Sequence, residues 1–285
     1  MSSFEKNITV IIVSFRSGYI IEKCIKSIKS NIQIIIVENS DNIQIKNYLE
    51  NKFSNVEVII AKENLGYGTA NNLGISKAKT KHVFILNPDT ILEKNCLKEL
   101  YKAQLILGNN FSILAPNLLN NYDYFLNQNN DLKKKNILEV DYVKGFAMLI
   151  NLKKVTFEKI FDENFFLFLE EIDLCKRIKN NRGKIFVVQK SKVMHLAKQS
   201  SGNSLNIELC RNWHWMWSLF YYNRKHFGVL TAYRVTIPKF TSTVIKLFIT
   251  LVLFNKKKIL IYYYRLNGLF NAFLKRPAWL RPDNF

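Results

Sequence analysis

Asp89 is the carboxylate around which the rest of the sequence can be arranged. It follows an apolar, strand-like run and belongs to the tripeptide Asn87-Pro88-Asp89. Pro88 has no N–H and cannot extend a ladder of hydrogen bonds, so the strand must end here. Ligands bind outside the carboxyl ends of strands in open α/β sheets, so this spacing predicts a ligand-binding carboxylate. The alternative is an ordinary strand-to-helix turn, in which Asp89 or Thr90 caps a helix over 93–107.

Two further polar tips follow strand-like runs. Glu38 comes after the run 33–37, and the glycines Gly66 and Gly68 come after the run 56–61. In a parallel sheet all these tips lie along one edge, which predicts a crevice for a nucleotide and its phosphates. A tight turn with helix capping explains the glycines equally well. The pattern lacks the last glycine of the dinucleotide fingerprint and follows the third strand, which disfavours a Rossmann dehydrogenase.

The elements that would position these residues alternate between strand and helix. Short, continuous, β-branched runs predict buried strands, and helical apolar spacing follows the first run. This alternation predicts a parallel sheet with helices on both faces. Beyond it, the polar stretch 122–135 is interpreted as a loop or flap. Strands are expected at 8–15, 33–37, 56–61, 83–86, 142–150, 184–188 and 193–195, with helices at 19–30, 66–78 and 203–226.

Glu170, Glu171 and Asp173 begin another expected helix, directly after the dense apolar run 165–169. Acids in a first turn are favoured by the helix dipole, and this structural reading suffices for the three residues alone. A carboxylate that is partly desolvated by neighbouring apolar side chains can also accept a proton in catalysis. Both readings stay open at the level of composition and spacing.

The order and spacing of six motifs resemble the GT-A, family 2 inverting glycosyltransferases, and most closely their bacterial rhamnosyltransferase branch. The resemblance covers about residues 8–228. It is carried by Val37-Glu38-Asn39, by Asn64-Leu65-Gly66-Tyr67-Gly68 with Ala70-Asn71-Asn72 and Gly74-Ile75, by Leu86-Asn87-Pro88-Asp89, by Gly145-Phe146-Ala147-Met148-Leu149, by Phe165-Phe166 with Phe168, Glu170-Glu171, Asp173-Leu174-Cys175 and Arg177, and by Val193 with His195.

The resemblance implies a GT-A (nucleotide-diphospho-sugar transferase) fold, with a mostly parallel central sheet flanked by helices, over residues 1–228. It implies an inverting hexosyltransferase that moves a sugar, expected to be rhamnose from dTDP-rhamnose, to a glycan or lipid-linked saccharide acceptor in bacterial surface polysaccharide synthesis. A divalent cation, Mg²⁺ or Mn²⁺, is the implied cofactor, because the leaving nucleoside diphosphate gains charge.

The resemblance also assigns roles residue by residue. Glu171 matches the catalytic base, with Glu170 beside it, and Asp89 with His195 would hold the metal. Asn87 stands where the family usually has the first Asp of Asp-x-Asp, and one carboxylate is a thin ligand set for a divalent ion. Arg16 replaces a common Asn after the first strand. The implied donor-binding residues are Ser14, Glu38, Asn64, Gly66, Asn71, Asn87, Asp89 and Arg177.

Composition fits a large folded domain in a reducing compartment. The chain has 285 residues, of which 48% are apolar, and its four cysteines show neither zinc-ligand spacing nor a disulfide framework. The N-terminus has no basic segment followed by a small-residue cleavage site, so we expect no signal peptide and a cytoplasmic location.

The positive charge is concentrated towards the C-terminus. Formal net charge is +20, and residues 211–285 hold 13 Lys or Arg against the single acid Asp283. Residues 229–285 are interpreted as a basic amphipathic helical tail that lies on the inner membrane face. Its apolar run 244–254 is too short to cross a bilayer, which needs roughly 20 residues. A helical pair packed on the core is the alternative.

Two other classes of protein compete with the enzyme reading. A non-catalytic, basic lipid- or nucleic-acid-binding protein on a nucleotide-binding fold would also explain the net charge. The charge, however, lies mostly in the apolar tail rather than in a stripe with base-stacking aromatics, so no nucleic-acid partner is expected. A nucleotidyltransferase would share the sheet, but the sequence lacks a lysine-bearing, glycine-rich loop after the first strand.

Overall fold

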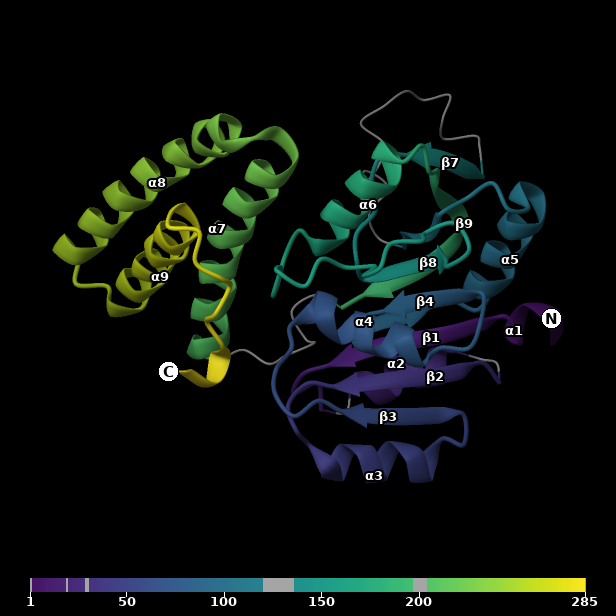
Figure 1. Cartoon of the computed structure of the whole chain (residues 1–285). Coiled ribbons are helices and arrows are strands. Elements are labelled where there is room, and N and C mark those ends of the chain that lie inside the picture. Colours follow the sequence, from purple (N-terminus) through teal and green to yellow (C-terminus); the bar gives the residue numbers. More distant parts are fainter. Residues whose placement is uncertain (1, 19, 29–30, 120–135, 197–203, 285) are drawn as a thin grey trace. The chain divides into compact units, whose positions relative to one another are not determined.

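A computed structural model describes residues 2–18, 20–28, 31–119, 136–196 and 204–284 (Figure 1). The chain divides into two compact units, here called the sheet unit and the helical unit. The sheet unit comprises Met1–Leu65, Thr69–Phe161 and Glu171–Gly202, and the helical unit comprises Gly66–Gly68, Asp162–Glu170 and Asn203–Phe285. The predicted boundary lay at residue 228. The expected loop at 122–135 lies outside the described residues.

The first half of the sheet is parallel, as the strand–helix alternation predicts. Its strands are β1 (Ile8–Ser14), β2 (Gln33–Glu38), β3 (Val56–Ile60) and β4 (His82–Leu86), in the spatial order β3-β2-β1-β4. Strands β1, β2 and β4 are almost wholly buried, because helices cover both of their faces. The edge strand β3 is less buried and leaves Glu57 exposed. The four strands predicted first along the chain are therefore confirmed, with ends that differ by a residue.

The second half of the sheet contains antiparallel pairs, which makes the sheet mixed rather than mostly parallel. The order continues β4-β8-β6-β9-β5, and β7 also pairs with β9. β4 pairs antiparallel with β8, and β9 pairs antiparallel with β5 and β7 but parallel with β6. These strands are β5 (Thr90–Leu92), β6 (Ile113–Leu118), β7 (Ile137–Val140), β8 (Ala147–Asn151) and β9 (Ile185–His195).

Several expected boundaries in this half are wrong. The strand expected at 142–150 begins only at Ala147, and the runs 184–188 and 193–195 form the single strand β9. Residues Thr90–Leu92 form β5, and the following helix, α5 (Cys96–Leu107), starts later than residue 93. Asp89 is therefore not part of a simple strand-to-helix turn, since a second strand follows it.

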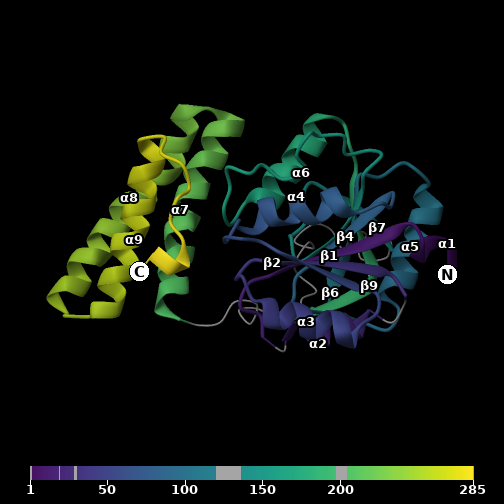
Figure 2. The same ribbon diagram turned by 60° about the horizontal axis from the view of Figure 1, so that its bottom comes forward.

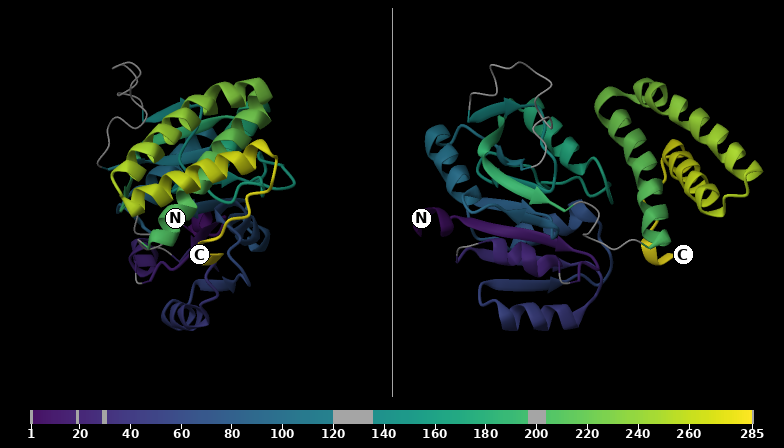
Figure 3. Two further views of the ribbon diagram at one scale, coloured as in Figure 1. Left: turned by 90° about the vertical axis from the view of Figure 1, so that its left-hand side faces the viewer. Right: turned by 180° about the vertical axis from the view of Figure 1, so that it is seen from behind.

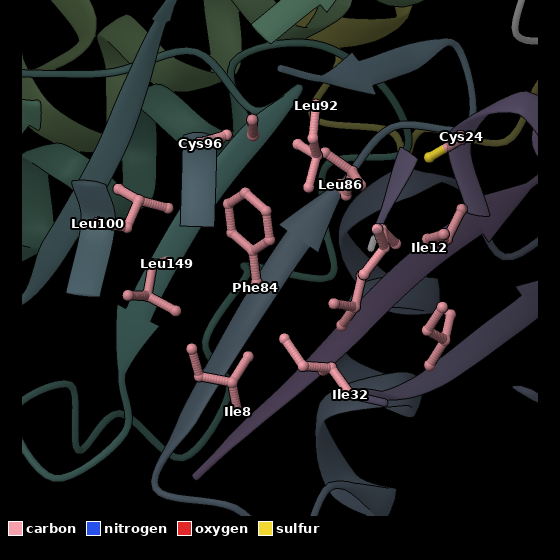
Figure 4. Packing of buried hydrophobic residues seen from close by; sticks show 14 of the residues in the cluster. Ile8, Ile12, Cys24, Ile32, Phe84, Leu86, Leu92, Cys96, Leu100 and Leu149 are labelled. Atoms are coloured by element: carbon pink, nitrogen blue, oxygen red, sulfur yellow. The ribbon is translucent and has the colours of Figure 1, made fainter. Parts of the chain in front are cut away.

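One face of the sheet packs against α2 (Ile20–Ser27) and α5. Figure 4 shows Ile8, Ile12 and Phe84 from β1 and β4 beside Cys24 from α2 and Leu100 from α5, all in one buried cluster. Alternate residues of each strand point to this face, as the pleat of a strand requires. Two further helices of this unit are α1 (Ser2–Glu5) and α3 (Ile43–Lys52), the latter against β3.

The opposite face of the sheet is covered by α4 (Tyr67–Lys77), which Figure 2 shows on the other side of the strands from α2. Gly74 makes this close approach possible, because an added Cβ would lie 2.5 Å from a methyl carbon of Ile11 and 3.3 Å from one of Val37. The remaining helix, α6 (Glu170–Asn180), precedes β9.

The helical unit is built from α7 (Leu205–Phe227), α8 (Val229–Val252), α9 (Lys256–Phe273) and the 3₁₀ turn η2 (Pro282–Asn284) (Figure 3). Trp213, Met216 and Phe220 of α7 pack with Leu269 of α9 in its buried core. Gly268 is buried as well, since a Cβ there would lie 2.3 Å from the carbonyl oxygen of Trp213. The side of α9 that carries Gly268 therefore packs against α7.

The burial pattern of α8 is inverted relative to an ordinary helix of a globular protein. Its buried positions are the small residue Ala232 and the threonines Thr236, Thr243 and Thr250. Each threonine hydroxyl donates to the carbonyl four residues earlier, so these buried groups are satisfied within the helix. The bulky apolar side chains point outward and are exposed: Leu230, Ile237, Val244, Ile245, Phe248, Ile249, Leu251 and Val252.

Helix α8 is also longer than expected. Within the described part of the chain, this one helix is long and apolar enough to cross a membrane by length and composition. The expectation of an apolar run too short to span a bilayer is wrong, because the helix continues through Pro238 to Val229 at its N-terminal end.

All four cysteines, Cys24, Cys96, Cys175 and Cys210, are free and buried. Burial raises the pKa of each thiol, to about 12 for Cys96, Cys175 and Cys210. Burial and the nearby charge of Asp89 also raise the pKa of Cys24. The thiols are packing groups with little thiolate character.

Candidate functional site

The polar tips of the parallel strands end at one edge of the sheet, as expected from their positions in the sequence. Ser14 and Glu38 are register partners at the ends of β1 and β2, and the N–H of Asn39 donates to the Ser14 carbonyl at 2.7 Å. Leu86 of β4 is paired with Ile12 of β1, so Asn87 follows at the same edge. The register alone thus brings Ser14, Glu38 and Asn87 to neighbouring strand ends.

Glu38 is buried and its orientation is fixed locally. Its Oε1 accepts hydrogen bonds from the Ser40 N–H, at 2.9 Å, and from the Ser40 hydroxyl. The Ser40 hydroxyl in turn accepts from the N–H of Arg16. Arg16 has φ of 52°, a left-handed conformation that a residue other than glycine rarely adopts. Residues of the loops after β1 and β2 therefore jointly fix the position of the Glu38 carboxylate.

Asn87 and Asp89 present buried oxygens that lack hydrogen-bond donors. Oδ1 of each side chain is buried and accepts no hydrogen bond from the described residues. The His195 imidazole lies 3.2 Å from Oδ1 of Asp89 but does not form a hydrogen bond with it. Their backbones, in contrast, form hydrogen bonds with neighbouring segments. The Asn87 N–H donates to the carbonyl of Phe146 at 2.9 Å, and the Leu196 N–H donates to the carbonyl of Asp89 at 2.9 Å. A buried polar atom without a partner is costly and calls for an explanation, such as an ion.

His195 faces Asp89 because β5 pairs with β9. Thr90 and His195 are register partners, and Nε2 of His195 lies 3.2 Å from Oδ1 of Asp89. The imidazole stacks on the ring of Phe146, with ring centroids 4.9 Å apart. Phe146 was part of a predicted motif but not of the predicted site. Its carbonyl holds Asn87 and its ring holds His195, so it positions both.

These residues fit a divalent cation that a substrate helps to bind. Among the described residues, no group of three or more His, Cys, Asp or Glu side chains could hold a metal ion by itself. Mg²⁺-type sites, however, commonly use one or two carboxylates and complete their shell with substrate phosphates and water. The two unsatisfied oxygens of Asn87 and Asp89, with the adjacent imidazole of His195, supply such a partial set.

Glu171 has the electrostatic character of a general base. It lies in the first turn of α6 and is half-buried. Burial raises the pKa of its carboxyl, although the N–H of Gly145 and the charge of Lys144 oppose that rise. Lys144 immediately precedes the Gly145 motif, yet sequence reasoning did not single it out. Lys144 and Gly145 lead directly into Phe146, so one short segment serves both Glu171 and Asn87.

The chain enters α6 through strained backbone. Phe168 and Leu169 have φ of 71° and 69°, and they stand directly before Glu170. Each left-handed residue with a large side chain costs roughly 1–3 kcal/mol, and such strain concentrates at functional sites. Packing by the surrounding structure must therefore keep the turn before Glu170 in this left-handed conformation.

Asp173 is unsuited to the role of a base. It is fully buried and accepts a hydrogen bond from Nε of Arg177 at 2.7 Å, within an ion pair. The guanidinium of Arg177 also donates to the carbonyls of Lys159 and Ile160, and it stacks over Phe157. Donor binding by Arg177 stays a prediction, beside these structural contacts.

The other predicted residues are placed as follows. Asn71 is buried in α4, and Asn64 is half-buried before it. Gly66 and the buried Glu170 belong to the helical unit. Gly66 has φ of 80°, and a Cβ there would lie 2.4 Å from the carbonyl oxygen of Phe166. The close approach that requires this glycine is thus made by the protein's own backbone. Phosphate binding at Gly66 remains a prediction.

Comparison with known proteins finds a family match in the first half of the sequence. Residues 9–150 match the family described as Glycosyl transferase family 2. The low-salt glycan biosynthesis hexosyltransferase Agl10 of Haloferax volcanii is 29% identical over 154 residues, which cover 46% of this chain and 49% of that protein. The chain thus spans about half the length of this curated relative.

Solved structures share the fold at low sequence identity. GalNAc-T7, crystallised with UDP, GalNAc and Mn²⁺, has a TM-score of 0.57 and 17% identity over 77% of this chain and 50% of that chain. TarS residues 1–349 of S. aureus has a TM-score of 0.52 and 13% identity over 95% of this chain and 92% of that chain. The expected GT-A fold is confirmed, with a mixed α/β sheet, flanking helices and a C-terminal apolar helix.

Proposed function

Because residues 9–150 form a glycosyl transferase family 2 domain, we propose that this chain transfers a sugar from a nucleotide-sugar donor to a hydroxyl of a glycan or lipid-linked acceptor, with inversion at the anomeric carbon. The relative Agl10 is a hexosyltransferase of glycan biosynthesis, and TarS has been crystallised with UDP. Both support a nucleoside-diphosphate sugar as donor and a glycan as acceptor.

The observation that carries the proposal is the pair of unsatisfied oxygens at the edge of the sheet. Oδ1 of Asn87 and Oδ1 of Asp89 are buried beside the His195 imidazole, without donors among the described residues. A divalent cation bound there would neutralise the charge that develops on a leaving diphosphate. We infer that Asp89, Asn87 and His195 hold Mg²⁺ or Mn²⁺ together with the donor.

Glu171 is proposed to accept the proton of the attacking hydroxyl. The acceptor oxygen forms a bond to the anomeric carbon as the bond to the diphosphate oxygen breaks, and the hydroxyl proton passes to the Glu171 carboxylate. Because burial raises the pKa of Glu171, its carboxylate is a stronger base than an exposed one. The N–H of Gly145 orients the carboxylate, and the charge of Lys144 opposes the rise in its pKa.

The donor sugar is proposed to be rhamnose, carried by dTDP. This choice rests on the resemblance of the motif set to the rhamnosyltransferase branch. UDP-sugars are the competing donors, since the solved neighbours were crystallised with UDP. The panel used below therefore contains both nucleotides.

We further propose that the helical unit binds the cytoplasmic membrane surface. Many bulky apolar side chains of α8 are exposed, whereas its buried positions are Ala232 and three threonines. Exposed apolar area of this extent marks an interaction site. The basic residues of 211–285 outnumber the single acid of that segment, Asp283, and suit anionic lipid headgroups, although Lys225 and Lys257 are paired with Asp162 and Glu208. Direct evidence for the membrane would come from the α8 substitutions described in the Discussion.

The substitution Glu171→Gln tests the reaction. Removal of a general base lowers turnover by roughly 10²–10⁴-fold, and we expect donor binding to change less than threefold. Turnover is measured with dTDP-rhamnose and a panel of UDP-sugars in the presence of Mn²⁺, and binding is measured by thermal shift with the same donors.

The matched control is Glu57→Gln, which removes an exposed carboxylate from β3. It should leave both quantities unchanged. Wild-type turnover in Glu171→Gln would show that Glu171 is not the base. Failure of the wild-type chain to bind any nucleotide-sugar would refute the proposed function as a whole.

A further inference from the structure

The helical unit contains a pocket that the proposed reaction does not use. It lies between the second half of α7, the C-terminal end of α9 and Asn164, and its volume is about 160 Å³. Sites that enclose a whole small-molecule ligand typically measure about 300–1,000 Å³, so this pocket suits a single headgroup-sized moiety. Its lining residues are Asn164, Trp217, Phe220, Tyr221, Arg224, Ala272, Lys275, Arg276 and Pro277.

The aromatic wall of the pocket is rigid. The rings of Trp217 and Tyr221 are stacked, with centroids 5.0 Å apart and an interplanar angle of 20°. The indole N–H of Trp217 donates to the carbonyl of Arg276 at 2.9 Å, and the Tyr221 hydroxyl donates to Asp162 at 2.9 Å. The indole N–H and the Tyr221 hydroxyl are therefore both satisfied. The Arg224 guanidinium lies over the Tyr221 ring, 5.6 Å from its centroid, so the aromatic wall holds one of the pocket's cations in place.

Three cations line the same pocket, and their charge is not neutralised by the protein. Arg224, Lys275 and Arg276 have no ion-pair partner in the part of the chain that the structure describes. The acid next to the pocket, Asp162, is already saturated: it accepts from Lys225 at 2.7 Å, from Tyr221, and from the N–H and amide of Asn164. Burial would raise the pKa of Asp162, but Lys225 and Asn164 hold it below its usual value, so its charge is fully engaged.

The backbone at Lys275 gives a second, independent observation. Lys275 has φ of 57°, and its N–H donates to the carbonyl of Ala272 while the Arg276 N–H donates to that of Asn271. This is the hydrogen-bond pattern of a Schellman motif, in which the left-handed position usually holds glycine. The chain instead puts a lysine there, and the lysine lines the pocket.

From these observations we propose that the pocket binds a phosphate-bearing group: the phosphate lies against Arg224, Lys275 and Arg276, and the attached sugar or glycerol moiety packs on Trp217 and Tyr221. Arginine and lysine side chains together suit phosphate, whose oxygens accept several charge-assisted hydrogen bonds. The group could come from the headgroup of an anionic lipid or from a phosphorylated saccharide acceptor. Assignment to an acceptor rests on the proposed function, whereas the phosphate site itself does not.

The chain carries its own reporter for this site. All four tryptophans, at positions 213, 215, 217 and 279, lie in the helical unit. Tryptophan fluorescence of the full-length protein, titrated with glucose 1-phosphate in the absence of divalent metal, therefore reports on this unit. We expect saturable quenching. Lys275→Gly and Arg224→Gln should each weaken the apparent affinity by roughly tenfold, the loss of one hydrogen bond to a charged group.

The choice of variants keeps the proposal falsifiable. Lys275→Gly places glycine where the backbone favours it, so the variant should unfold at the same or a higher temperature than the wild type. The control Lys239→Gln removes one exposed charge from α8, in the same unit but outside the pocket, and should change affinity less than twofold. Three results would each overturn the site: no saturable binding by the wild type, wild-type affinity in Lys275→Gly and Arg224→Gln, or a loss of affinity in Lys239→Gln as large as theirs.

A second arm separates the two sources of phosphate. Vesicles of phosphatidylcholine with and without phosphatidylglycerol are mixed with each variant, and bound protein is measured by flotation. If the two pocket variants lose phosphatidylglycerol-dependent binding far more than Lys239→Gln, the headgroup is the ligand. If they lose only glucose 1-phosphate binding, a phosphorylated acceptor is favoured. Glu171→Gln should titrate like the wild type, so failure of the enzyme proposal would leave this result readable.

Discussion

The sheet edge at Asp89 and the outer face of α8 depart from the usual rule of burial in opposite directions. At the sheet edge, polar oxygens of Asn87 and Asp89 lie inside the protein without donors. On α8, side chains such as Phe248 lie outside the protein, while Thr243 faces inward. Neither arrangement contributes to folding stability. The contrast teaches that each region has groups without a suitable partner in the protein. In the proposed function these partners are a cation and a diphosphate in the first case and a lipid phase in the second.

The largest effect should come from Asp89→Asn, which keeps the shape of the side chain and removes its charge. Loss of a metal-binding carboxylate removes several kcal/mol of charge stabilisation in the transition state, so turnover should fall on the order of 10³-fold. EDTA should reduce turnover of the wild type similarly, and Mn²⁺ should strengthen donor binding by the wild type only. Turnover and thermal shift with donor and Mn²⁺ measure these effects.

Asp41→Asn is the matched control, since Asp41 is exposed just after β2. It should behave as the wild type. Full turnover after thorough chelation would show that the reaction needs no divalent cation. A Mn²⁺ response retained in Asp89→Asn would show that Asp89 does not hold the cation.

A smaller effect is expected on α8. The triple substitution Ile245→Gln, Phe248→Gln and Val252→Gln replaces three exposed apolar residues on one face of the helix. Complete burial of each such side chain is worth about 1.5–3 kcal/mol, so even partial insertion of the three into lipid predicts that binding of the variant to vesicles weakens by at least roughly 10²-fold. Donor binding should be unaffected. Point substitutions are preferable to truncation, because Leu269 and Ala272 of α9 belong to the core of the helical unit.

The control for α8 is the double substitution Leu105→Gln and Ile106→Gln, which removes similarly exposed apolar residues from α5 in the sheet unit. It should float with vesicles as the wild type does. If the α8 variant floats with vesicles as well as the wild type does, the apolar face of α8 binds something other than lipid.

The smallest effect concerns the stability of the sheet unit. The folded-state pKa of Glu171 is raised, so its contribution to the free energy of unfolding is present at low pH and is lost as pH rises through that raised pKa. Glu171→Gln should therefore unfold at a higher temperature than the wild type near pH 7.5 and at nearly the same temperature near pH 4. Circular dichroism is the suitable probe, because the tryptophans lie in the other unit. A stability difference independent of pH would contradict the raised pKa.

The parallel half of the sheet could be predicted because each of its strands is a continuous apolar run that ends in a polar tip. The other half could not. Strand β6 contains Pro116 and Asn117, and proline normally argues against a central strand. The structure accommodates it with a register shift against β9 between Pro116 and Asn117. Local sequence does not reveal such a shift.

The sequence names candidate residues of the site, but it does not reveal the contacts that position them. The positions at strand ends and the family resemblance point to Glu38, Asp89 and Glu171 as candidates. In contrast, His195 lies opposite Asp89 because β9 pairs with β5. Strand β5 has only three residues and begins two residues after Pro88, so the sequence does not reveal it. Phe146 contacts Asn87 through its carbonyl and His195 through its ring, and Lys144 acts on Glu171 through its charge. The spacing of residues in the sequence does not predict these contacts. The length of α8 was equally hard to predict. Proline usually breaks a helix, but Pro238 interrupts neither α8 nor its outward apolar face.

The burial of all four native thiols makes the chain ready for site-specific labelling without further engineering. A maleimide reagent reacts with thiolate, and the pKa values of about 12 for Cys96, Cys175 and Cys210 leave almost none at neutral pH. A cysteine introduced at the exposed Phe254 would therefore take up a nitroxide or an environment-sensitive dye selectively. The depth of that label in a bilayer could then be read spectroscopically on an otherwise unaltered protein.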